Sequence, residues 1–84
     1  MNIDAISSVF KKAFPGFVLG TVMDADDSYI VSLTRNHLPN GVYVMDSMYE
    51  YMKKDGSIKP FIVGLNTSKY KKALKNIVYK KPQR

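Results

Sequence analysis

The absence of cysteine limits the possible folds of this chain more than any other feature of its sequence. The chain has 84 residues, and a domain of that size buries only about 60–65% of the surface that its unfolded chain exposes. Small secreted domains usually add disulfides to so small a core, but neither disulfides nor cysteine zinc sites are possible here. We therefore expect one core, stabilised by packing, in a protein of the reducing cytoplasm.

We expect no signal peptide and no membrane segment. The apolar stretch from Phe14 to Met23 is interrupted by Pro15, Gly16 and Gly20. A membrane-spanning helix needs about 20 consecutive apolar residues, which this stretch does not supply. The residues before it also lack the basic region with which a signal peptide begins.

Two stretches have the three- and four-residue apolar repeat of amphipathic helices. The first covers residues 3–13 and ends before Pro15, which disfavours helical geometry in the residue that precedes it. The second covers about residues 68–80, between the capping residues 66–68 and Pro82. The pattern thus predicts a helix near each end of the chain.

The residues between these helices have the composition of β-strands. Segments 17–23 and 29–34 are rich in β-branched and aromatic residues, and the polar run 24–28 between them predicts a hairpin. A third strand is expected within residues 42–52, bent near residues 46–47. Asp55-Gly56 favours a tight turn before a fourth strand at 58–63, where Pro60 requires an edge or a bulge.

The expected fold is therefore α+β. It consists of an N-terminal helix, a four-stranded, mainly antiparallel sheet and a C-terminal helix, with the helices packed on one face of the sheet. We expect a single domain over residues 1–81, followed by a short basic tail at 82–84.

Positive charge is concentrated in the second part of the sequence. Residues 1–52 carry three basic and six acidic residues, net −3, whereas residues 53–84 carry ten basic residues and one acid, net +9. This asymmetry favours nucleic acid or an acidic protein surface as the partner. The candidate nucleic-acid contacts are Lys69, Lys71, Lys72, Lys75, Lys80, Lys81 and Arg84. The same lysines would also make a small helix soluble and complement its dipole.

A second candidate surface lies near the third strand, where tyrosine and methionine are frequent. Both residue types are enriched at protein interfaces, and tyrosine also stacks on single-stranded bases. The candidate partner-binding residues are Met45, Met48, Tyr49 and Tyr51. Packing within the core or against a sheet face is the alternative role for these side chains.

No motif in the sequence indicates catalysis, a metal or a cofactor. His37 is the single histidine, and no serine near it belongs to a nucleophile motif. The acidic run from Asp24 to Asp27 departs from the calcium-loop pattern, because Tyr29 occupies the glycine position and Arg35 the glutamate position. We expect a protein that is not an enzyme and binds no cofactor or metal.

The segment Tyr49–Phe61 reads Tyr-Glu-Tyr-Met-Lys-Lys-Asp-Gly-Ser-Ile-Lys-Pro-Phe. It resembles a hairpin of small uncharacterised proteins from phages and prophages of Gram-positive bacteria, which tend to read Tyr-x-Val-x-Lys-Lys-Thr-Gly-x-Ile-x-x-Phe. Asp55 stands here in place of the threonine. Those proteins also begin with an amphipathic helix that ends in Phe-Pro, like Phe14-Pro15, and have a Pro/Gly loop before the hairpin, like residues 38–41.

The order of helices and strands resembles that family over most of the chain, but the amino acids themselves match only in the hairpin. The lysine-rich C-terminal end is less typical of the family. It implies a role in particle assembly or in an accessory interaction within the host, without catalytic residues. The leading hypothesis is therefore a non-catalytic phage-encoded accessory or assembly protein that binds a viral structural or host protein, in the host cytoplasm or on the virion.

Two other functions stay open. The basic C-terminal helix and tail predict a nucleic-acid-binding accessory protein whose affinity falls as salt rises. A third hypothesis is a regulator that covers the active site of an enzyme, through either the acidic run 24–27 or the basic helix.

Overall fold

The computed structural model describes residues 3–35 and 47–80. The elements of these two ranges, in chain order, are α1 (Ile3–Ala13), β1 (Phe17–Asp24), β2 (Ser28–Arg35), β3 (Ser47–Met52), β4 (Ile58–Pro60), the 3-10 helix η1 (Val63–Leu65), α2 (Thr67–Ala73) and β5 (Ile77–Lys80). The predicted α+β class is confirmed, with its N-terminal helix, antiparallel sheet and C-terminal helix. No helix within the described ranges is long and apolar enough to cross a membrane.

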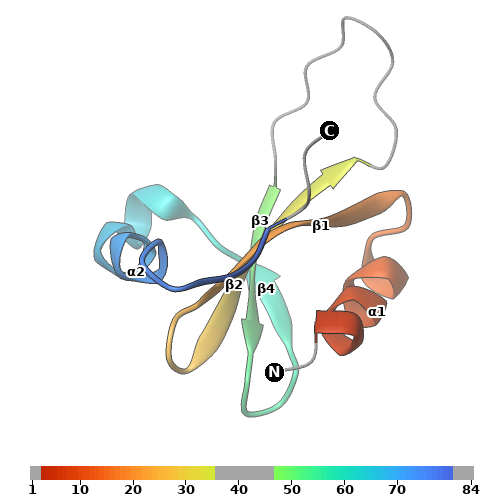
Figure 1. Ribbon diagram of the computed structural model, residues 1–84, viewed down its shortest axis with the longest axis horizontal. Helices are drawn as coiled ribbons and strands as arrows, with labels where there is room; N and C mark the ends of the chain where they lie inside the picture. The colour runs from red at the N-terminus through yellow and green to blue at the C-terminus, as the bar shows by residue number, and fades with distance from the viewer. Residues whose placement is uncertain (1–2, 36–46, 81–84) are drawn as a thin grey trace, which may run out of the picture.

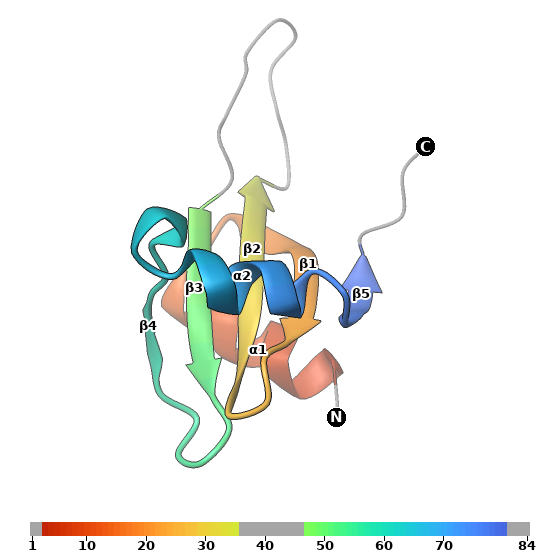
Figure 2. The ribbon, with the colours of Figure 1, turned by 90° about the vertical axis from the view of Figure 1, so that its left-hand side faces the viewer.

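The described strands form one antiparallel sheet in the order β4-β3-β2-β1-β5 (Figure 2). The predicted hairpin is β1 and β2, and its turn contains Asp26 with a positive φ of 68°. The strand that contains Pro60 is β4, and it lies at one edge of the sheet, as the missing proline N–H requires. Residues 36–46, which include part of the predicted third strand, lie outside the described ranges.

Helix α1 covers one face of the sheet (Figure 1). The helix presents Ile6 and Phe10 to the strands, as the four-residue apolar spacing predicts. Partly buried aromatic rings, among them Tyr49 and Tyr51 of β3, pack around this cluster. Its fully buried members are Ile6, Phe10, Leu19, Val22, Val31 and Leu33.

Helix α2 covers the opposite face, so the prediction of both helices on one face is wrong (Figures 1 and 2). Alternate residues of a strand point to opposite faces, and both β1 and β2 bury apolar side chains on each face. The buried apolar residues on the α2 side are Met23, Ile30, Phe61 and Ala73. The sheet is therefore the middle of three layers.

The predicted helix at 68–80 is too long. Helix α2 ends at Ala73, and residues 77–80 form β5, which pairs antiparallel with β1. The backbone N–H of Asp24 donates to the carbonyl of Asn76 at 2.9 Å, and the β1–β5 pairing continues from there. The edge of β1 away from β2 has backbone N–H and C=O groups that need hydrogen-bond partners, and a strand at residues 77–80 supplies them. The β-branched residues Ile77 and Val78 also favour a strand over a longer helix.

Candidate functional site

The four candidate partner-binding residues do not share one surface. Met48 packs on the α2 side of the sheet, whereas Tyr49 and Tyr51 lie on the α1 side. The Tyr49 ring lies 4.5 Å from Phe14 and the Tyr51 ring 6.5 Å from Phe10, measured between ring centroids. Both tyrosines therefore serve as partly buried packing of the core. Met45 lies outside the described residues.

The candidate nucleic-acid contacts are also divided. Lys71, Lys72, Lys75 and Lys80 are exposed. Lys69 is different, because its ammonium is held in ion pairs with Glu50 and Asp27. Lys81 and Arg84 lie outside the described part of the chain.

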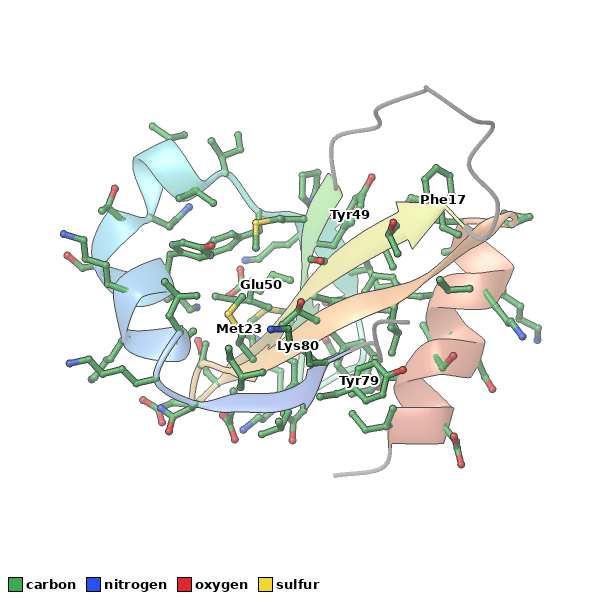
Figure 3. All side chains as sticks on the ribbon, turned by 45° about the horizontal axis from the view of Figure 1, so that its top comes forward. Phe17, Met23, Tyr49, Glu50, Tyr79 and Lys80 are labelled. Carbon is green, nitrogen blue, oxygen red and sulfur yellow. The ribbon has the colours of Figure 1, made fainter. Side chains whose placement is uncertain are left out.

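The ion pair of Lys69 belongs to a buried polar network that sequence reasoning missed. Glu50 of β3 is only 6% exposed and lies on the α2 side of the sheet (Figure 3). One of its carboxylate oxygens accepts hydrogen bonds from the Ser28 hydroxyl at 2.6 Å and from Lys69 Nζ. Lys59 Nζ lies 3.9 Å from the other oxygen. The network joins helix α2 to strands β2, β3 and β4.

The contacts of Glu50 keep its carboxylate ionised. Burial by itself raises the pKa of Glu50, but the hydrogen bonds from Lys69 and Ser28 and the charges of Lys69 and Lys59 outweigh it, so the pKa lies below its ordinary value. The hydrogen bond to Glu50 raises the pKa of Lys69 in turn. Glu50 is therefore a charged structural acceptor at neutral pH and a poor general acid.

We expect the free energy of unfolding to fall in acid because of this carboxylate. The folded pKa of Glu50 is lower than the ordinary value of 4.5, so its stabilisation is present above that pH and is lost as the pH falls through the folded value. Urea unfolding followed by circular dichroism at about pH 7, 5, 4 and 3 measures this loss. The Glu50→Gln variant, which cannot titrate there, should show a smaller slope, and equal slopes would contradict the assignment.

Two of the three carboxylates in the acidic turn between β1 and β2 are paired with lysines of the fold. Lys53 Nζ donates to Asp24 Oδ1 at 2.9 Å, and this bond lowers the pKa of Asp24. Lys69 Nζ lies 3.1 Å from Asp27 Oδ1 and lowers the pKa of that carboxyl too. Among the described residues, no three histidine, cysteine, aspartate or glutamate side chains are grouped to hold a metal ion. The turn is thus a less suitable acidic contact surface than its sequence suggests.

A groove of about 400 Å³ lies between α2 and the sheet. Its lining residues are Thr21 and Met23 from β1, Ser32 from β2, Met48 from β3, Tyr70 and Leu74 from α2 and its C-cap, and Ile77 and Lys80 from β5. Leu74 is 43% exposed and Ile77 46%, although both are large apolar side chains. Figure 3 shows Met23 and Lys80 on this side of the sheet and Tyr79 on the other.

Close packing of two strands shapes the floor of the groove. A Cβ atom added to Gly20 would lie 2.8 Å from Ser32 Oγ and 3.3 Å from the Ser32 carbonyl oxygen. The β1–β2 register shifts between Leu19 and Thr21, so Gly20 lies at a bulge. Glycine therefore allows β1 to approach Ser32 in the groove floor.

Another hollow, of about 330 Å³, lies between α2 and the β1–β2 turn. Lys69 and Asp24 line it, and each already pairs with a charge of the fold. The groove between α2 and the sheet is the better candidate site, because two large apolar side chains of its lining, Leu74 and Ile77, are exposed and its lysine is free of an acidic partner among the described residues.

The predicted helix at residues 68–80 has the groove residues Leu74 and Ile77 on its buried stripe. The signal that predicts their true position is the run Ile77-Val78-Tyr79, which has the β-branched and aromatic composition of a strand. Once this run is a strand, Leu74 ends the helix and Ile77 begins β5, and both border the groove.

Comparison of the chain with family models, with curated proteins and with solved structures finds no match in any of the three.

Proposed function

We propose that this protein is a non-catalytic accessory or assembly protein that binds a viral or host protein through the groove between α2 and the sheet. The observation that carries the proposal is the pair of exposed apolar side chains, Leu74 and Ile77, beside Met48 and Tyr70 in one groove. A small soluble domain gains stability by burying such residues, and their exposure together favours an interaction site. The resemblance of residues 49–61 to a hairpin of small phage proteins favours a viral or host protein as the partner.

The composition of the groove supports a protein partner. Methionine and tyrosine are enriched at protein interfaces, because methionine adapts its shape and tyrosine combines a large apolar ring with a polar tip. Met48 and Tyr70 both occupy the groove. Of the residues first considered for partner binding, Met48 is thus the one that the proposal retains.

The electrostatics of the acidic side chains support a role without catalysis. The pKa values of Glu50, Asp24 and Asp27 are all lowered. General acid catalysis near neutral pH calls for the opposite shift, a carboxyl whose pKa is raised towards the working pH. These carboxylates hold the turn and helix α2 in place.

The test of the proposal is affinity capture followed by binding to the purified partner. The bait proteins are the wild type, Leu74→Glu and the control Leu65→Glu, whose original side chain is 79% exposed and outside the groove. A charge buried in an apolar contact should weaken binding at least about tenfold, or 1.4 kcal/mol, for Leu74→Glu only. The baits are presented to Gram-positive host extract and to virions.

Two results would overturn the proposal. One is a purified partner that binds all three baits equally. The other is turnover of a substrate by a protein that binds no virion or host component. Unfolding curves of the three baits establish that each is folded, which is expected because both substituted side chains are exposed.

A second function, nucleic-acid binding, is favoured by the exposed lysines of α2 and β5. Lys71, Lys72, Lys75 and Lys80 form no ion pair with any acidic side chain in residues 3–35 and 47–80. This function predicts tight binding to DNA that collapses between about 50 and 200 mM salt. Fluorescence anisotropy with labelled single- and double-stranded DNA measures it, and the absence of binding at low salt contradicts it.

A further inference from the structure

We infer that the element of the partner that fills the groove is an acidic amphipathic helix, which lies beside α2 and across the strands. This inference rests on the proposed function and adds the chemistry and conformation of the bound segment. It follows from the direction of the groove, from the backbone groups available there and from the charges around it.

The groove runs across the sheet. Its floor takes residues from β3, β2, β1 and β5 in turn, which are neighbouring strands in that order. Strands are spaced about 4.8 Å apart, so the four span about 14 Å, the length of two and a half turns of α-helix. Helix α2, which forms one wall, also runs across the strands (Figure 2). An occupant that follows the groove therefore lies alongside α2.

A segment bound in the groove must form the hydrogen bonds of its backbone N–H and C=O groups within itself. The groove floor presents side chains, while the backbone groups of β1, β2 and β3 pair with neighbouring strands. An extended segment across these strands would leave its N–H and C=O groups without protein partners in an apolar contact, which is costly. A helix satisfies those groups internally and presents an apolar stripe at three- and four-residue steps. The groove therefore favours a helix over a strand.

The charges around the groove determine the character of its occupant. Lys80 lines the groove. Each helical residue is turned by about 100° from the one before it, so Lys71 lies next to Tyr70 on the outer side of the same wall, and Lys75 follows Leu74 in the turn after the helix. None of these three lysines pairs with an acid among the described residues. Glutamate and aspartate along the edges of the bound helix would pair with them.

The same charges disfavour a second copy of this chain as the occupant. In a symmetric pairing of two copies, the exposed lysines around the groove, Lys71, Lys75 and Lys80, would face the same lysines of the other copy. Two such surfaces repel each other, whereas an acidic helix is attracted to the groove and its association is accelerated.

Synthetic peptides of about 15 residues, capped at both ends, test the inference directly. The first has leucine at three- and four-residue steps and glutamate on the remaining face. The second has the same composition with leucine at every second position, which suits a strand. The third replaces glutamate with lysine. Fluorescence anisotropy gives the dissociation constants, and circular dichroism of the complex gives the conformation of the peptide.

The expected result is that the first peptide binds as a helix, at least tenfold more tightly than the second, and that the third does not bind. Leu74→Glu and Lys80→Glu should each weaken binding of the first peptide at least tenfold, and Leu65→Glu should leave it unchanged. Equal binding of the first two peptides, or of the first and third, would overturn the inference.

The peptide result separates this inference from the proposed function. If no peptide binds while a captured partner still depends on Leu74, the acidic helix is wrong and the groove remains the docking site. If neither the peptides nor the captured partner depend on Leu74, both proposals are wrong.

Discussion

Replacing Phe10 with alanine is expected to lower the free energy of unfolding by about 3–5 kcal/mol, because the substitution leaves a cavity in a core that cannot fully collapse. Phe10 is 2% exposed and lies at the centre of the α1 side of the sheet. Its ring centroid is 6.1 Å from that of Phe14 and 6.3 Å from that of Tyr49. Urea unfolding followed by circular dichroism measures the loss.

The matched control for this substitution is Ser8→Ala, on the exposed side of the same helix. Its effect should stay within about 0.5 kcal/mol, as is usual for surface substitutions. A Phe10→Ala variant as stable as this control would mean that α1 does not complete the core.

Replacing Lys69 with methionine is expected to cost about 2–4 kcal/mol, because it removes the main partner of the buried Glu50 carboxylate. The expected cost lies below that of breaking a fully buried pair, since one third of the Lys69 side chain is exposed and Lys59 Nζ stays 3.9 Å from Glu50. Thermal and urea unfolding at neutral pH measure it. Lys72→Met, at an exposed position of the same helix, is the matched control.

The double variant Glu50→Leu with Lys69→Met separates charge from packing. Removing both charges leaves no buried ion without a partner, so the double variant should be more stable than Lys69→Met alone. Additive losses would contradict this account, because they would show that the two side chains contribute independently.

Much of the fold was predictable because its signals are local. The helix at residues 3–13 is confirmed at both ends, since the apolar spacing and Pro15 are both close in sequence to the residues they control. The hairpin of β1 and β2 is confirmed for the same reason, as is the edge position of the strand that contains Pro60.

The remaining features depend on residues far apart in the sequence. The composition of residues 77–79 favours a strand, but their apolar spacing also fits a helical stripe, and the free edge of β1, more than 50 residues earlier, selects the strand. The pairing of Lys69 with Glu50 likewise joins α2 to β3. Propensity alone cannot choose between such alternatives, because tertiary contacts override it.

The candidate surface near β3 shows the same limit. Residues 48–51 are neighbours in sequence, but the alternation of a strand sends Met48 and Glu50 to one face and Tyr49 and Tyr51 to the other. Sequence reasoning identified residue types suited to an interface, and the groove retains one of those residues, Met48.

The pairing of β5 with β1 also affects how the chain reaches this structure. Residues 21–23 of β1 pair with residues 77–80, and β2, β3, β4 and α2 all lie between them in the sequence. Closing so long a loop is entropically costly, and contacts of high sequence separation slow folding. On a ribosome, the outer edge of β1 therefore remains unpaired until residue 80 has emerged. A segment of another protein that pairs with this edge early would trap a sheet without β5, and hence without the part of the groove that Ile77 supplies.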